Sequence, residues 1–97
     1  MGAFNELIHQ PVRLQIMAAL NALGAEEQVD FKTLRETLGV TDGNLATHLR
    51  KLEEAGYITV HKTFVGRRPR TYVAITPAGR LAFADHLQAL RAILDAR

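Results

Sequence analysis

With 97 residues, 47% of them apolar, the chain can bury one hydrophobic core, and a single domain spanning residues 1–97 is expected. It contains neither cysteine nor serine, which excludes disulfides, thiolate metal sites and the nucleophiles of serine and cysteine hydrolases. The formal net charge is only +2, but no Asp or Glu occurs between Ala55 and Ala84, where five Lys and Arg residues fall, so one side of the molecule should be positive.

The first residues have no basic start followed by a sustained apolar run, so no signal peptide is expected. No stretch reaches membrane-spanning length, which favours a soluble, cytoplasmic protein without a membrane partner. Residues 4–8 are expected to form a short leading helix. Whether residues 1–10 join a subunit interface is left open.

A longer helix is predicted to begin at Pro11, because proline is tolerated in a first turn, and to end at Gly24. Its apolar residues recur at helical spacing and should face the core: Val12, Ile16, Met17, Leu20 and Leu23. At its start, Arg13 can contact a phosphate or form a structural ion pair, and the ion pair is the favoured interpretation. Further on, residues 29–30 fit either a short strand or the lead into a capped helix.

Residues 31–57 have the pattern of two helices joined by a tight turn. The apolar positions of the first helix lie on one face: Phe31, Leu34 and Leu38. Gly39 suits a left-handed C-terminal cap, since it has no Cβ to clash, and Thr41 or Asp42 can cap the second helix. That helix should run to about Ala55. Its apolar stripe, which should be buried, consists of Leu45, Leu49 and Leu52.

The opposite face of the second helix is polar and carries groups that can read base edges in a DNA major groove. Asn can bond bidentately to adenine, Lys can reach guanine or a phosphate, and Thr offers a hydroxyl and a methyl group. The candidate base readers are Asp42 and Gly43 at the helix tip, and Asn44, Thr47, His48 and Lys51 along the helix. A merely solvated face is the alternative, because helix–turn–helix periodicity recurs in many small helical proteins.

Two predicted strands joined by a basic loop follow. Residues 57–65 and 71–76 are rich in alternating β-branched and aromatic residues, and four of them should face the core: Ile58, Val60, Val73 and Ile75. Between the strands, Gly66 and Pro69 meet the needs of a turn but leave three arginines unexplained: Arg67, Arg68 and Arg70. Clustered guanidinium groups repel one another unless an anion lies between them. Contact with phosphates or a minor groove is therefore preferred over a solvated loop.

The last helix is predicted to begin at Thr76, with Thr76 as the cap and Pro77 in the first turn. Apolar residues then recur at spacings of four, three and four, as in the seam of a short coiled coil. One small domain needs only part of this surface for its own core, so residues 76–97 are expected to pair with a second copy of the chain. Packing on the first helix of the same chain is the alternative. The predicted interface consists of Leu81, Phe83, Ala84, Leu87, Leu90, Ile93 and Leu94.

The order of these elements resembles the winged helix-turn-helix of small transcriptional regulators related to the MarR and ArsR repressors. The segments that carry the resemblance cover nearly the whole chain: HQPVRLQIMAAL, LGVTDGNLATHLRKLEEAGYI and KTFVGRRPRTYVAITPAGR. It implies a mainly helical α+β fold with a three-helix core, a β-hairpin wing and a C-terminal dimerisation helix. It also implies that residues 42–55 form the recognition helix and residues 65–70 the wing.

The chain departs from that pattern in two ways. It has no cysteine for the thiolate metal sensing of many ArsR relatives. Its histidines are scattered along the sequence, namely His9, His48, His61 and His86. No metal site and no cofactor are therefore predicted. It also lacks the extra helices that enclose ligands in larger MarR proteins. An effector pocket would therefore lie at the dimer interface, and the effector itself is unknown.

These observations predict a sequence-specific DNA-binding regulator that acts as a homodimer, with recognition helices in successive major grooves. Side chains expected to hold the DNA backbone, besides the three arginines of the wing, are Lys32, Thr33, Thr41, Arg50 and Lys62. A winged-helix protein–protein interaction module is the alternative. No enzyme is predicted, since the sequence has no paired carboxylates, activated nucleophile or phosphate-cradling glycine loop.

Overall fold

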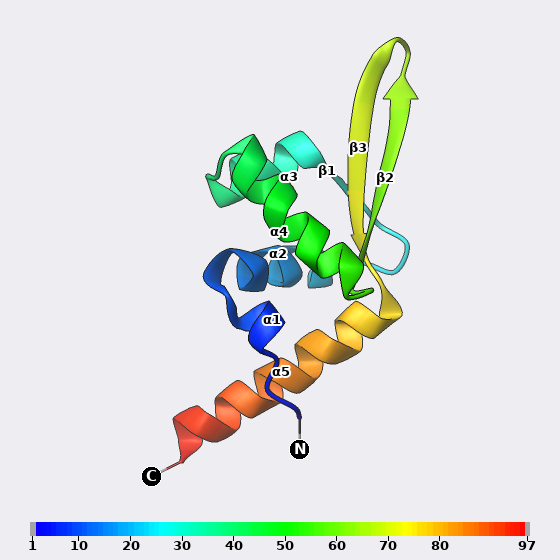
Figure 1. Cartoon of the computed structure of the whole chain (residues 1–97). Coiled ribbons are helices and arrows are strands. Elements are labelled where there is room, and N and C mark those ends of the chain that lie inside the picture. Colours follow the sequence, from blue (N-terminus) through cyan, green and yellow to red (C-terminus); the bar gives the residue numbers. More distant parts are fainter. Residues whose placement is uncertain (1, 97) are drawn as a thin grey trace.

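The computed structural model describes residues 2–96 and contains five helices and a small antiparallel sheet, most of which projects from the helices as a hairpin (Figure 1). In chain order the elements are α1 (Glu6–His9), α2 (Pro11–Asn21), β1 (Val29–Asp30), α3 (Phe31–Leu38), α4 (Asp42–Glu54), β2 (Ile58–Val65), β3 (Arg68–Ile75) and α5 (Pro77–Asp95). The strand order is β1-β3-β2. This is the predicted α+β winged helix-turn-helix. Met1 and Arg97, the outer ends of the predicted domain and terminal helix, lie outside the described residues.

The core lies where α2, α3 and α4 pack together against the base of the sheet and the first half of α5. Its buried apolar side chains are Ile8, Ile16, Met17, Leu20, Leu34, Leu45, Leu49, Leu52, Ile58, Val73 and Phe83. The predicted leucine stripe of α4 is fully part of this core. Burying each such side chain contributes about 1.5–3 kcal/mol relative to leaving it in water, so this stripe fixes which face of α4 remains outside.

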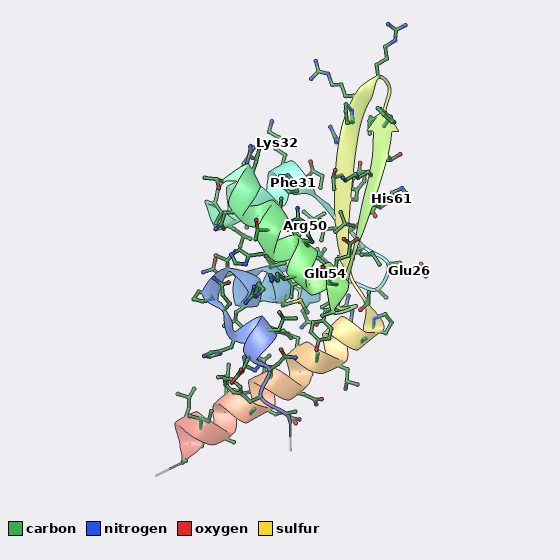
Figure 2. The ribbon with its side chains drawn as sticks, in the orientation of Figure 1. Glu26, Phe31, Lys32, Arg50, Glu54 and His61 are labelled. Atoms are coloured by element: carbon green, nitrogen blue, oxygen red, sulfur yellow. The ribbon has the colours of Figure 1, made fainter. Side chains whose placement is uncertain are left out.

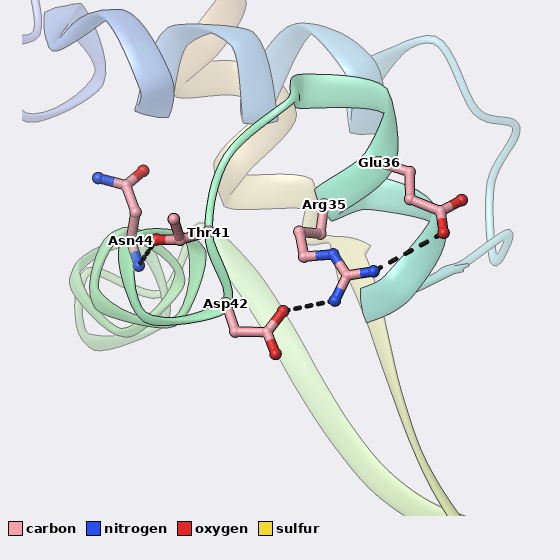
Figure 3. Close-up of polar contacts among 5 residues, drawn as sticks. All are labelled: Arg35, Glu36, Thr41, Asp42 and Asn44. Carbon is pink, nitrogen blue, oxygen red and sulfur yellow. Dashed lines mark hydrogen bonds and ion pairs between the residues drawn. The ribbon is translucent and has the colours of Figure 1, made fainter.

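The turn between α3 and α4 is built as the sequence predicts. Gly39 is left-handed, with a φ of 67°, and its N–H donates to the carbonyl oxygen of Arg35. Thr41 is the cap of α4, because its side-chain oxygen accepts from the backbone N–H of Asn44 at 3.1 Å (Figure 3). The carboxylate of Asp42 instead pairs with Arg35 at 2.7 Å, which holds the two helices in register.

Helix α2 ends at Asn21, short of the predicted stop at Gly24. A long-range contact accounts for the difference. The guanidinium group of Arg80, on α5, donates to the carbonyl oxygens of Asn21 (3.1 Å), Leu23 (2.9 Å) and Gly24 (3.2 Å). A cation at this end of a helix satisfies carbonyl groups that have no partner within it. Arg80 therefore belongs to the scaffold rather than to the positive surface.

The hairpin of β2 and β3, called the wing from here on, stands away from the helices (Figure 1). The predicted loop at residues 66–70 is wrong, because the strands pair up to Val65 and Arg68 and leave only Gly66 and Arg67 in the turn. Pro69 lies within β3, opposite Phe64. Strand β1 pairs only with residues 72 and 73, so β3 has a free edge at Pro69 and the missing N–H of the proline removes no ladder bond.

Helix α5 begins as predicted, with the Thr76 side chain accepting from the N–H of Gly79 at 2.9 Å. Gly79 is buried so closely against the carbonyl group of Tyr57 that a Cβ would not fit there. Phe83, at 5% exposure, and His86, at 0%, also face the body of the molecule. The second half of α5 extends past the other elements (Figure 1). Within residues 2–96, no helix is both long and apolar enough to cross a membrane.

Candidate nucleic-acid interface

Most of the predicted base readers form one exposed face of α4. Gly43, Asn44, Thr47 and Lys51 are exposed opposite the buried leucine stripe, and Asp42 is exposed at the helix tip. A Cβ added at Gly43 would meet no atom within 4 Å, so nothing in the described chain requires a glycine there. The absence of a side chain instead leaves room for another molecule to approach the helix tip closely.

Two of these side chains already have internal partners. The Thr47 hydroxyl donates to the carbonyl oxygen of Gly43 at 2.9 Å, so outward it can offer an acceptor lone pair and a methyl group rather than a donor. The Asp42 carboxylate is bound by Arg35, whose pKa it raises by hydrogen bonding and by charge (Figure 3). Asp42 is therefore better suited to aligning α3 with α4 than to accepting a hydrogen bond from a base.

His48 lies half-buried at the edge of this face. Its Nδ1 is 3.4 Å from Nη1 of Arg13, at the start of α2. The Nε of Arg13 donates to the carbonyl oxygen of Leu7 at 2.6 Å. The ion pair predicted for Arg13 is wrong, since in residues 2–96 ion pairs are formed only by Arg35. Burial and the charge of Arg13 lower the pKa of His48.

A groove of about 310 Å³ separates α4 from the wing. Side chains from α3, α4, β2 and β3 line it: Phe31, Ala46, Leu49, Arg50, Glu53, Val60, Lys62 and Thr71. Figure 2 shows Arg50 on the side of α4 that faces the wing, whereas His61 points away on the far side of β2. Two of the predicted backbone-binding cations, Arg50 and Lys62, are thus brought together although they are 12 residues apart in the sequence.

A second, more polar hollow of about 340 Å³ lies between the start of α3 and the wing. Three further predicted cations line it, namely Lys32, Arg68 and Arg70. Asp30 is its one acidic group, and a hydrogen bond from Thr33, with a smaller contribution from the charge of Arg70, lowers the pKa of Asp30. Thr33 and Thr41 are exposed, and the Thr41 hydroxyl already accepts from the backbone of α4.

The arginine side chains of the wing are exposed, and in the described chain Arg67, Arg68 and Arg70 form no ion pair. Arg68 and Arg70 are two residues apart on β3 and so share one face of the hairpin, while Arg67 occupies the turn. Phe64 and Val65 beside them are also exposed. The wing therefore presents a basic tip with some apolar surface.

The predicted dimer surface on α5 is only partly available. Phe83 is buried in the core of its own chain, so it does not lie on that surface. Leu81 is exposed but, two residues from Phe83, it points to the other side of the helix. The stripe that is buried near the start of α5 continues along the projecting end, where Leu87, Ile93 (60%) and Leu94 (79%) are exposed and Leu90 is half-buried. Ala84 is exposed on the flank of this stripe.

The structure also joins two histidines whose proximity the sequence does not indicate. His86 on α5 accepts a hydrogen bond at Nδ1 from the backbone N–H of Asn5 (2.9 Å), and its Nε2 lies 3.2 Å from Nδ1 of His9. The ring of Phe4 packs against both, with centroid distances of 4.8 Å. No local spacing could reveal this cluster, because His9 and His86 are 77 residues apart.

Comparisons with known proteins agree on the architecture. A family model described as a winged helix DNA-binding domain matches residues 12–94. The uncharacterized protein MJ0432 of Methanocaldococcus jannaschii is 39% identical over 82 residues, which cover 84% of this chain and 86% of the relative. The structure of a transcriptional regulator homologue from Pyrococcus horikoshii OT3 is similar with a TM-score of 0.83 and 34% identity, over 94% of this chain and 87% of that one. A protein from Enterococcus faecalis V583 assigned to the MarR family of transcriptional regulators is similar with a TM-score of 0.69 and 26% identity, over 92% and 76% of the two chains.

Proposed function

The chain belongs to the winged helix DNA-binding domain family, and we propose that it is a transcriptional regulator that binds a specific DNA sequence as a homodimer. The coarse function follows from the family and from the MarR-type architecture. The contacts with the two DNA grooves and the assembly into a homodimer are our own proposal.

One observation carries the proposal: α4 and the wing lie on either side of one groove, and the polar face of α4 and the arginines of the wing are exposed, so that no part of the described chain covers them. A helix with an open polar face can enter the major groove, which is about 12 Å wide. The wing then reaches the neighbouring backbone or minor groove. Its three arginines can form charge-assisted bonds to phosphates or enter a narrow minor groove.

The proposed readers of base edges are those exposed side chains of α4 that have free polar groups. Asn44 and Lys51 carry the strongest discriminating groups, an amide and an ammonium. Thr47 contributes a methyl group and an acceptor, and Gly43 allows close approach. Such contacts specify sequence, whereas contacts to phosphates fix the position of the protein on the duplex.

Charge supports the same arrangement. The pair Arg50 and Lys62 in the groove and the trio Lys32, Arg68 and Arg70 in the second hollow form two neighbouring basic clusters, because Phe31 and Thr71 line both hollows. Asp42, the acid closest to the helix tip, is neutralised by Arg35. Thr33 and Thr41 are exposed and can add hydroxyl contacts to the backbone. Each neutralised phosphate releases counterions, so binding should weaken steeply with salt.

The second half of α5 is the proposed dimer surface. This half of the helix extends past the other elements (Figure 1), and its apolar stripe is exposed at Leu87, Ile93 and Leu94 and half-buried at Leu90. Two copies related by a two-fold axis would bury these stripes against each other, as in a short coiled coil. The recognition helices would then enter successive major grooves about 10 base pairs apart.

A selection experiment with the full chain tests this proposal. The protein is incubated with a random duplex pool, and bound fragments are amplified and sequenced over several rounds. We expect a motif with two-fold symmetry, and affinity for it well above the affinity for random DNA at two salt concentrations. A protein–protein interaction module would instead enrich no sequence and show no salt-dependent DNA binding.

A further inference from the structure

His48 sits at the boundary between the proposed DNA-reading face and the scaffold, and its ring contacts only Arg13 among the hydrogen-bonding groups of residues 2–96. Arginine has donors and no acceptor, so the 3.4 Å contact between Nη1 and Nδ1 requires Nδ1 of His48 to accept. In a neutral imidazole the other nitrogen then carries the proton. His48 is therefore held with its proton on Nε2.

Arg13 is itself fixed in place. Its Nε donates to the carbonyl oxygen of Leu7 at 2.6 Å, and its backbone N–H donates to the Gln10 side chain at 2.9 Å. No carboxylate pairs with it anywhere in the described part of the chain. A protonated His48 would place a donor against a donor and one positive charge beside another, so the neutral ring is favoured.

The Nε2 side of the ring is open. It has no hydrogen-bond partner in residues 2–96, and no buried side-chain nitrogen or oxygen of this segment lacks a partner, so Nε2 must reach solvent. His48 is four residues after Asn44 and three before Lys51, which places all three on one flank of α4. The Nε2 proton is thus presented beside the proposed base readers.

We propose that Arg13 is a positioning residue that makes His48 an obligatory hydrogen-bond donor to a base edge, and so excludes cytosine at one position of each half-site. In the major groove, guanine offers two acceptors, adenine and thymine one each, whereas cytosine offers only its amino donor. Guanine is the best partner. This inference rests on the proposed function, but its first step does not need DNA.

The first test is the tautomer of His48 in the free protein. Nitrogen-15 NMR at neutral pH distinguishes a protonated from an unprotonated ring nitrogen, and the His48→Gln variant assigns the signals. We expect the Nε2–H form in the wild type, a mixture in Arg13→Met, and restoration of the Nε2–H form in Arg13→Lys, which keeps a donor. The Nδ1–H form in the wild type, or an unchanged spectrum in Arg13→Met, would overturn the inference. Circular dichroism establishes that each variant is folded.

The second test is the sequence preference. The wild type, Arg13→Met, His48→Ala and a control, Gln15→Met at an exposed site of α2, are each used for selection from a random duplex pool. We expect one position per half-site to be depleted of cytosine roughly tenfold in the wild type and the control, and this depletion to vanish in the other two while the remaining positions persist. If Arg13→Met selects the same motif as the wild type, the positioning role of Arg13 is refuted, but the proposed function is not. If the wild type selects no motif, both the positioning role and the proposed function are refuted.

Discussion

His9 and His86 are joined by a hydrogen bond of 3.2 Å that links α1 to α5. The backbone N–H of Asn5 donates to Nδ1 of His86, so the proton of the neutral ring lies on Nε2 and is donated to Nδ1 of His9. Protonating His86 would place a second proton at Nδ1, against the Asn5 N–H. This pair therefore favours the neutral state of a fully buried histidine.

The stability of the fold should depend on pH through His86. Burial, with a smaller contribution from His9, lowers its pKa below the ordinary value of 6.5. The unfolded chain then binds more protons than the folded chain, so the stabilisation is complete above that ordinary value and is lost as the pH falls below it. We expect the free energy of unfolding, measured with urea between about pH 8 and pH 5, to decrease on acidification.

The matched variants for that measurement are His86→Gln and His61→Gln. Glutamine at position 86 can still accept from Asn5 and donate to His9, but it does not titrate, so the decrease in stability should become smaller. His61 is exposed on the wing, away from this pair, so its replacement is the control for the loss of one histidine. If His86→Gln retained the full wild-type slope, another group would be responsible.

Replacing Asn44 or Lys51 with alanine should lower the ratio of affinities for cognate and random DNA. Each side chain is exposed on α4 and can discriminate among base pairs, which is worth about 1–3 kcal/mol for a good bidentate contact, or roughly 5- to 150-fold in affinity. Fluorescence anisotropy with the selected duplex and with a scrambled one measures the ratio. Gln15→Ala, on the exposed side of α2, is the control. Equal losses on both duplexes would show that these residues contact only the backbone.

The double variant Arg67→Ala/Arg68→Ala should weaken binding to every sequence by a similar factor. Each arginine that neutralises a phosphate contributes about 0.9 to the slope of log affinity against log salt, so removing two should flatten that slope by roughly 2. Anisotropy titrations at four salt concentrations provide the slope. Arg91→Ala removes an exposed cation from α5, away from the wing, and should leave the slope unchanged. A slope that is also unchanged in the double variant would place the wing off the DNA.

Introducing a charge into the projecting stripe of α5 should separate the subunits. Leu94 is 79% exposed, so Leu94→Glu places a carboxylate in the proposed interface without disturbing the core. Sedimentation velocity should show a shift from dimer toward monomer. Ala92 is exposed two residues earlier, on the opposite side of the helix, so Ala92→Glu should behave as the wild type. A monomeric wild type, or dissociation by both substitutions alike, would contradict this interface.

The local sequence pattern was sufficient to predict the helices and strands, but it could not predict contacts between residues far apart in the sequence. The leucine stripe of α4, the left-handed Gly39 and the caps at Thr41 and Thr76 depend on neighbouring residues, and these predictions are confirmed. The end of α2 depends on Arg80, 59 residues from Asn21, which no local pattern reveals. Pro69 by itself indicates a loop. It is tolerated in β3 because β1 is too short to pair with β3 at that position, and the length of β1 is not visible from the residues around Pro69.

The candidate site shows the same division. The face of α4 and the basic wing can be read from periodicity and charge, since both are properties of one segment. The sequence predicts an ion pair for Arg13, whereas the fold places a carbonyl group and a histidine beside it. Phe83 continues the coiled-coil spacing, but the first half of α5 lies against the body, so this one residue of the stripe turns inward.

Methylation protection on the selected duplex tests the central claim most directly, because dimethyl sulfate reports guanine N7 in the major groove and adenine N3 in the minor groove. We expect the wild type to protect guanine N7 in two major-groove segments about one helical turn apart, with protected adenine N3 in the adjoining minor grooves. The minor-groove protection alone should disappear in Arg67→Ala/Arg68→Ala. Protection confined to the minor groove, or none in either groove at saturating protein, would contradict the reading of DNA by α4 and the wing together.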